Sequence, residues 1–143
     1  MLDLSNYQRS DAIRAALDKK RIAVVGLSNN PARPSHDVAR YMLEQNDGYT
    51  VIPVNPTQSE IFGATCYPDL LAAREDCGEI EMVNVFRDSS AVPAIAAEAI
   101  AIGAAVLWLQ LGVINAEGIK LAESAGLNVV VDRCLKIEHA RLK

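Results

Sequence analysis

Residues 21–35 read Arg21-Ile-Ala-Val-Val-Gly-Leu-Ser-Asn-Asn-Pro-Ala-Arg-Pro-Ser35, and the rest of the chain is organised around them. Ile22 to Val25 form a short, mostly β-branched apolar run without alternation, which is typical of a strand covered on both faces in a parallel sheet. Gly26 ends this run, a polar loop follows, and we expect a helix to start at Ser35. A strand, a loop and a helix in this order predict the first unit of a nucleotide-binding α/β domain, where backbone N–H groups and the helix N-terminus meet a phosphate.

The loop departs from the dinucleotide-binding fingerprint, which needs three glycines in the pattern G-x-G-x-x-G. After Gly26 it contains prolines and Arg33 instead of further glycines. Prolines restrict the backbone, so we expect a longer and stiffer loop in which the Arg33 guanidinium supplies the counter-charge to a phosphate. A solvated loop arginine is the alternative interpretation.

Length and composition predict a single domain over residues 1–143, because a chain of 143 residues, half of them apolar, can bury one sizeable core. Capping residues followed by Ile13, Ala16 and Leu17 at helical spacing predict a leading helix within residues 1–20. The formal net charge of -4, without a basic cluster, argues against nucleic-acid binding. No apolar segment approaches the ~20 residues of a membrane helix, and the N-terminus lacks the regions of a signal peptide. We therefore expect a cytoplasmic protein with neither nucleic acid nor membrane among its partners.

The cysteines and histidines do not form a metal-binding or catalytic pattern. The 3 cysteines show no C-x-x-C spacing, and the 2 histidines, His36 and His139, belong to no ligand cluster. The serine nucleophile pattern G-x-S-x-G is also absent. Cys134 follows Asp132 and Arg133, and a cationic neighbour can lower the pKa of a thiol, so the reactivity of this cysteine stays open. We expect no metal and no catalytic residue.

Four further apolar runs predict strands within residues 50–56, 79–87, 106–111 and 129–132. Stretches with helical spacing and capping residues separate them, so the chain predicts a parallel, doubly wound five-stranded sheet with helices on both faces. Right-handed crossovers lead us to expect the strand order 3-2-1-4-5. Ligands of such sheets bind at the carboxyl ends of the strands, at a switch point that this order puts between the first and the fourth strand.

Polar side chains follow every expected strand. They are Ser28, Asn55, Arg87, Gln110, Asp132 and Arg133. Solvent alone would select polar residues at these positions, but it does not easily explain two arginines at one rim of the sheet.

The strand within residues 50–56 ends without the Asp or Glu that would bind the ribose of NAD, because no carboxylate lies between Thr50 and Ser59.

A series of short motifs runs along the chain from about Arg21 to His139. They are Gly26-Leu-Ser28, Pro31, Arg33-Pro-Ser35, Pro53-Val-Asn-Pro56, Ile61, Gly63, Cys66-Tyr-Pro68, Leu70, Val85-Phe-Arg87, Trp108-Leu-Gln110, Gly112 and Asp132-Arg-Cys134. In this order and spacing the sequence resembles a CoA-binding domain. The resemblance is to the small stand-alone CoA-binding proteins, whose fold is shared with the N-terminal domain of the succinyl-CoA synthetase α subunit and of ADP-forming acyl-CoA synthetases.

The resemblance implies a Rossmann-like fold and a set of CoA-binding residues. The loop from Ser28 to Ser35 would hold the CoA phosphates, the Pro53 to Pro56 corner would lie along the adenosine or its 3′-phosphate, and the Val85 to Arg87 tip along the other side of the nucleotide. The synthetases carry further domains, with a phosphohistidine and an ATP-binding fold, for which this chain has neither the length nor a candidate His motif. Ligase activity is therefore not expected. The candidate cofactor-binding residues are Gly26, Ser28, Arg33, Ser35, Pro53, Asn55, Pro56, Phe86, Arg87, Gln110 and Gly112.

Together these observations favour the non-catalytic binding of coenzyme A or an acyl-CoA. One alternative is an NAD(P)-dependent oxidoreductase of the same fold, in which Arg33 would take a 2′-phosphate. Another is a domain that docks to a partner enzyme and binds no ligand. The acyl group, a sensing or delivering role, the oligomeric state and any protein partner are left open.

Overall fold

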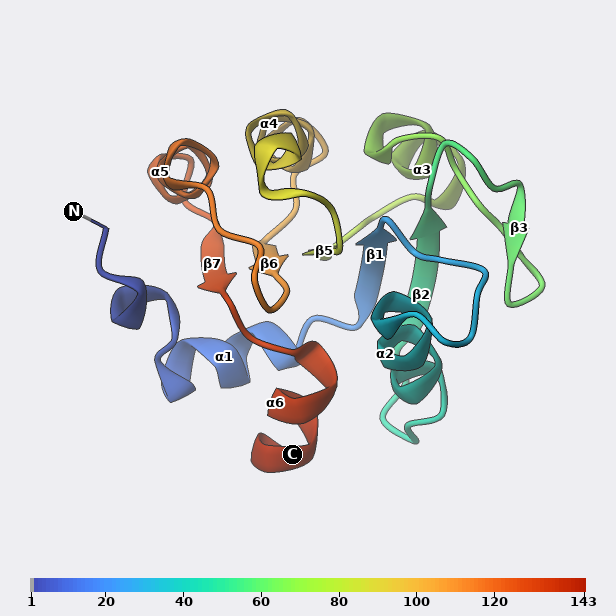
Figure 1. Cartoon of the computed structure of the whole chain (residues 1–143), viewed down its shortest axis with the longest axis horizontal. Coiled ribbons are helices and arrows are strands. Elements are labelled where there is room, and N and C mark those ends of the chain that lie inside the picture. The colour runs from blue at the N-terminus through green and yellow to red at the C-terminus, as the bar shows by residue number, and fades with distance from the viewer. Residues whose placement is uncertain (1) are drawn as a thin grey trace.

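The computed structural model describes residues 2–143, in which parallel strands form a central sheet between two layers of helices (Figure 1). The five strands are β1 Arg21–Val25, β2 Thr50–Val54, β5 Met82–Val85, β6 Val106–Leu109 and β7 Asn128–Val131. The α-helices are α1 Ser10–Leu17, α2 Pro34–Leu43, α3 Leu70–Cys77, α4 Val92–Ala101, α5 Ala116–Ser124 and α6 Leu135–Leu142. Short 3-10 helices cover Leu4–Tyr7 and Ser89–Ala91, and β3 Glu60–Ile61 pairs with β4 Ala64–Thr65 in a small hairpin. The expected α/β class with five parallel strands and helices on both faces is confirmed.

The expected strand order 3-2-1-4-5 is wrong. The observed order is β2-β1-β5-β6-β7, which is 2-1-3-4-5 in the numbering of the five expected strands. The third expected strand, β5, pairs with β1, with Ala23 opposite Val83, instead of lying outside β2. The switch point therefore lies between β1 and β5 and not between the first and the fourth strand.

Pro53 explains why β2 is an edge strand. A proline has no N–H to donate to a neighbouring strand, and a strand on the outer side of β2 would have lost a hydrogen bond at this position. A short irregular segment lies there instead: the Tyr67 N–H donates to the Pro53 carbonyl at 3.0 Å, and the Asn55 N–H donates to the Tyr67 carbonyl at 2.8 Å. Neither bond needs an N–H group from Pro53, because Pro53 takes part only through its carbonyl oxygen.

Alternate residues of the strands face two separate hydrophobic cores, which explains their continuous apolar runs. In β1, Ala23 and Val25 face the core under α3, α4 and α5, whereas Ile22 and Val24 face the core under α1, α2 and α6. Figure 1 shows the two sets of helices on opposite faces of the sheet. Trp108 in β6 belongs to the second core and is fully buried, and its indole N–H donates to the Arg133 carbonyl at 2.8 Å.

Local signals set the ends of the helices. Pro34 is the first residue of α2, one position before the expected start, which suits a residue without an N–H. Asn115 caps α5 as expected, because its side-chain oxygen accepts from the Gly118 N–H at 2.9 Å. None of the helices within residues 2–143 has the length and apolarity needed to cross a membrane.

Candidate ligand-binding site

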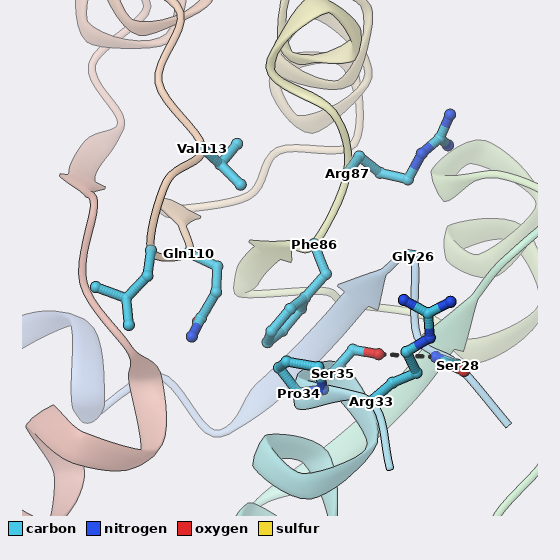
Figure 2. Close-up of a pocket in the computed structure, with 10 residues that line it drawn as sticks. Gly26, Ser28, Arg33, Pro34, Ser35, Phe86, Arg87, Gln110 and Val113 are labelled. Atoms are coloured by element: carbon cyan, nitrogen blue, oxygen red, sulfur yellow. Dashed lines mark hydrogen bonds between the residues drawn. The ribbon is translucent and has the colours of Figure 1, made fainter. Parts of the chain in front are cut away.

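A cavity of about 510 Å³ opens at the carboxyl ends of β1, β5 and β6, next to the switch point (Figure 2). Its volume is in the range of ordinary small-molecule sites. The residues that line it come from the β1–α2 loop, the end of β5 and the end of β6. They are Gly26, Ser28, Arg33, Pro34, Ser35, Phe86, Arg87, Gln110, Leu111 and Val113.

Gly26 brings the end of β1 into close contact with the end of β5. Its φ of +86° is in the left-handed region, and a Cβ atom at this position would lie 2.3 Å from the Phe86 carbonyl oxygen. The Phe86 N–H donates to the Val25 carbonyl at 2.8 Å, which holds the two strand ends together. Both the backbone conformation and the lack of space therefore require glycine here.

Side-chain hydrogen bonds shape the β1–α2 loop from within. The Ser28 N–H donates to the hydroxyl of Ser35, a buried residue, at 2.9 Å. The Asn30 N–H donates to the Ser28 hydroxyl at 3.0 Å, and the Ala32 N–H donates to the Asn30 side-chain oxygen at 3.0 Å. The sequence predicted a stiff loop from its prolines, and these short-range bonds provide a further restraint.

The N-terminus of α2 lies at the cavity without a side-chain cap. Arg33 is the N-cap residue and its side chain makes no capping hydrogen bond, while Pro34 at the first helical position has no N–H. The first turn of a helix carries a positive partial charge from its aligned peptide dipoles. This end of α2 therefore favours an anion, as the sequence predicted.

Two arginines add full positive charge to the cavity. Arg33 and Arg87 both line it, both are exposed, and within residues 2–143 neither side chain makes an ion pair or a hydrogen bond. They come from different parts of the chain, Arg33 from the loop before α2 and Arg87 from the end of β5, and the Arg87 side chain extends away from Ser35 (Figure 2). Guanidinium groups bind phosphates through paired hydrogen bonds, so these two side chains are suited to an anionic ligand.

The part of the cavity next to β6 is uncharged. Gln110 is buried, and its side-chain oxygen accepts from the Leu135 N–H at 3.5 Å. Leu111 is 54% exposed, whereas Val113 is buried, and the Phe86 ring lies between Gln110 and the β1–α2 loop (Figure 2). The cavity thus has a cationic part near β1 and a mainly apolar part near β6.

The remaining candidate residues lie outside this cavity. The side-chain groups of Asn55 are used within its own corner, where the amide nitrogen donates to the Leu27 carbonyl at 3.0 Å and the oxygen accepts from the Thr57 N–H at 2.9 Å. Pro53 lies at the outer edge of β2. Pro56 lines a second cavity of about 60 Å³, which Arg87 also lines. The Gly112 N–H donates to the Asp132 carboxylate at 2.7 Å, which holds the loop after β6 in place.

The candidate residues did not include three that line the cavity, Pro34, Leu111 and Val113. Pro34 lies within the loop from Ser28 to Ser35 that the sequence assigned to the phosphates, and Leu111 directly follows Gln110, whereas no sequence signal indicated Val113. Cys134, whose reactivity the sequence left open because Arg133 precedes it, is buried and does not line the cavity. Within residues 2–143, no group of three or more His, Cys, Asp or Glu side chains is placed to hold a metal ion.

Comparison with known proteins identifies relatives that match almost the whole chain. The family model described as "CoA binding domain" matches residues 20–140. The Bacillus subtilis (strain 168) protein named "Uncharacterized protein YneT" is 44% identical over 140 residues, which is 98% of this chain and 100% of the relative.

Solved structures have the same fold. A hypothetical protein from Pyrococcus horikoshii OT3 is 37% identical with a TM-score of 0.87, covering 99% of this chain and 97% of that one. The structure of cell-free ID.343 from Thermus thermophilus is 41% identical with a TM-score of 0.84, covering 95% and 100% of the two chains. A dinucleotide forming acetyl-coenzyme A synthetase 1 from Ca. Korarchaeum cryptofilum is 22% identical with a TM-score of 0.62, and the match covers 89% of this chain and 27% of the synthetase chain. At this identity the likeness shows a shared fold alone. On the family match and the identity to its full-length relatives, this chain belongs to the CoA-binding domain family.

Proposed function

We propose that this protein binds coenzyme A or an acyl-CoA in the cavity at the ends of β1, β5 and β6. The observation that carries the proposal is the pair of arginines, Arg33 and Arg87, which line one cavity that no carboxylate lines and which form no ion pair within residues 2–143. CoA carries a diphosphate and a 3′-phosphate, so it supplies the negative charge that this cavity lacks. Membership of the CoA-binding domain family supports the same ligand.

The β1–α2 loop is the proposed place of the diphosphate. Gly26, Ser28 and Ser35 line the cavity there together with Arg33, at the uncapped end of α2. A loop already ordered by internal hydrogen bonds loses little further conformational freedom when a ligand binds, which favours affinity.

The adenosine end of the ligand is proposed to lie toward β2. Arg87 lines both the main cavity and the smaller one beside Pro56, so it connects the two. We assign the corner from Pro53 to Pro56, with Asn55, to the adenosine or its 3′-phosphate. Phe86 and Gln110 then lie on the way to the other end of the ligand, and Gly112 supports that wall through Asp132.

NAD(P) is the less suitable ligand. NAD-binding sheets of this type present a carboxylate at the end of the second strand to bind the ribose, and the segment from Thr50 to Ser59 contains none. For a 2′-phosphate the same argument is weaker, because Arg33 could take it. The choice between CoA and NADP therefore needs a direct comparison.

We also propose that binding is not accompanied by a chemical step in this chain. The residues that line the cavity include no His, Cys, Lys, Asp or Glu. Ser35 is the buried hydroxyl, and it accepts from the Ser28 N–H instead of facing a general base. Acid–base and nucleophilic catalysis need such groups within hydrogen-bond distance of one another.

Thermal unfolding in the presence of each ligand tests the proposal. A ligand that binds only the folded state stabilises it by RT ln(1 + [L]/Kd), so at equal concentration CoA should raise the Tm more than NAD or NADP. A larger shift with NADP would favour the oxidoreductase. No shift with any of them would contradict ligand binding and leave the partner-docking domain.

A further inference from the structure

Gln110 is held in place by its backbone and by the oxygen of its side-chain amide. It follows β6 directly, its N–H donates to the Val85 carbonyl at 3.2 Å, and its carbonyl accepts from the Val113 N–H at 2.9 Å. Its side-chain oxygen accepts from the N–H of Leu135, the first residue of α6, at 3.5 Å. This contact assigns the orientation of the amide, because only an oxygen can accept from a backbone N–H.

The other half of the same amide has no partner. Gln110 is 6% exposed, and within residues 2–143 its one side-chain hydrogen bond is the bond that its oxygen accepts from Leu135, so Nε2 donates to no group there. Nε2 is not completely covered, because Gln110 lines the cavity, and Figure 2 shows the amide nitrogen directed into it beside the Phe86 ring. A largely buried N–H group without an acceptor is unfavourable, so this position favours a ligand that brings an acceptor.

The surroundings of Nε2 select a neutral acceptor. Both arginines lie on the β1 and β5 side of the cavity, whereas Gln110 lies among Phe86, Leu111 and Val113. A phosphate would lose hydration there without a cation to compensate for it, but a carbonyl oxygen would accept from the amide at little cost.

The distance between the two parts of the cavity agrees with this division. β5 lies between β1 and β6. Since neighbouring strands lie about 4.8 Å apart, the ends of β1 and β6 are roughly 10 Å apart. The pantetheine arm of CoA leaves the diphosphate as a neutral chain with amide carbonyls along its length, so its carbonyls can reach β6 when the diphosphate lies at the β1–α2 loop.

We infer that the β6 part of the cavity is a recognition site for the pantetheine arm, in which the Gln110 Nε2 donates to an amide carbonyl of that arm. This inference rests on the proposed function and goes beyond it, because it makes Gln110 a specificity-determining residue. The protein then distinguishes CoA from adenine nucleotides that lack the arm. Adenosine 3′,5′-bisphosphate, which carries the 3′-phosphate and the first of the two 5′-phosphates of CoA, is such a nucleotide.

Calorimetric titration of three proteins with two ligands tests this inference. The proteins are the unaltered chain, Gln110→Met and Gln110→Glu, and the ligands are CoA and adenosine 3′,5′-bisphosphate. Gln110→Met removes the donor at similar side-chain length, and Gln110→Glu removes the donor but keeps the acceptor for Leu135. Loss of one neutral hydrogen bond should weaken CoA binding by about 2- to 12-fold in Gln110→Met, while binding of the bisphosphate stays unchanged. Gln110→Glu should weaken CoA binding by at least as much.

Gln45→Met is the matched control. Gln45 is half-buried, and its amide nitrogen donates to the Tyr41 carbonyl at 2.7 Å, outside the cavity. This variant should bind both ligands as the unaltered chain does. Equal weakening of CoA and bisphosphate binding in Gln110→Met would overturn the inference, because it would show a purely structural role, and so would unchanged CoA binding. Failure of the unaltered chain to bind CoA would instead contradict the proposed function.

Discussion

The backbone N–H of Ser28 and the side-chain hydroxyl of Ser35 are joined by a hydrogen bond of 2.9 Å that closes the β1–α2 loop. The two residues are 7 positions apart, one just after β1 and one in the first turn of α2. Because Ser35 is buried beside the cavity, this bond sets the shape of the loop that carries Arg33.

Replacing Ser35 by alanine should destabilise the protein. The change removes the acceptor of the Ser28 N–H, and the loss of one hydrogen bond of a half-buried group costs about 0.5–1.5 kcal/mol. The Tm should fall by about 2–4 °C for each kcal/mol in a chain of this size. Ser124→Ala, at the exposed end of α5, is the control and should change the free energy of unfolding by no more than about 0.5 kcal/mol. Equal melting temperatures for the two variants would show that the bond contributes nothing measurable.

Gly26→Ala should destabilise the protein more than Gly103→Ala. Both glycines have a positive φ, +86° and +75°, so alanine costs about 1–2 kcal/mol of backbone strain at either position. A Cβ at Gly26 also meets the Phe86 carbonyl at 2.3 Å, whereas a Cβ at Gly103 meets nothing within 4 Å. The close contact should add about 1–3 kcal/mol, which urea unfolding of both variants would measure. A similar loss in both would mean that the β1 and β5 ends separate easily.

Arg33→Ala should weaken CoA binding without unfolding the protein. A charge-assisted hydrogen bond from guanidinium to phosphate is worth about 1.5–3 kcal/mol, which corresponds to a 10- to 150-fold loss of affinity. Arg33→Lys should recover only part of the loss, because an ammonium group keeps the charge but not the planar pair of donors.

The control for Arg33 is Arg14→Ala, which makes the same change of net charge on α1, outside the cavity. Calorimetric titration with CoA and a Tm measurement on each variant decide the outcome. Unchanged affinity in Arg33→Ala would identify Arg33 as a solvated loop residue and leave the phosphates to the backbone and Arg87.

The acid stability of the protein should depend on Asp47. Its carboxylate contacts the His139 Nε2 at 3.0 Å, and this hydrogen bond, with a smaller contribution from the charge of Lys20, holds the pKa of Asp47 below its usual range. A carboxyl group with a lowered pKa in the folded state stabilises the protein above its unfolded pKa, near 3.9, and this contribution is lost as the pH falls through the folded pKa.

Asp47→Asn tests this pH dependence, because asparagine keeps an oxygen that can accept from His139 but has no titratable proton. The unaltered chain should be more stable than the variant at pH 6, and the difference should shrink as the pH falls below 4. Urea unfolding at several pH values measures it. A difference that stays constant from pH 6 to pH 2 would contradict the role of Asp47.

Much of the architecture could be predicted because its signals are local. The run from Ile22 to Val25 is apolar on both sides and forms a strand between two cores, and Asn115 caps α5 through its own side chain. Among the candidate site residues, those that directly follow β1, β5 and β6 line one cavity, because parallel strands end at one edge of the sheet.

The position of β5 could not be predicted from the same signals. A right-handed crossover can bring the strand after β2 either to the outer side of β2 or back to the free side of β1, and both arrangements bury the same apolar residues. Pro53 carried the deciding information, since a strand without a donor at this position is suited to the edge. Its effect is visible only when the possible neighbours of β2 are compared.

The sequence alone determined which segments become strands and helices and which strand ends are polar, because apolar runs, caps and turn residues act over a few neighbouring positions. The tertiary structure decided which of these segments meet. Gln110 is separated from Leu135 by 25 positions, yet the contact between them orients its amide, and the pairing of β5 with β1 brings Phe86 and Arg87 beside Gly26. Such contacts depend on the order of the strands in the sheet, which is settled by the packing of the whole chain rather than by the preference of any one segment.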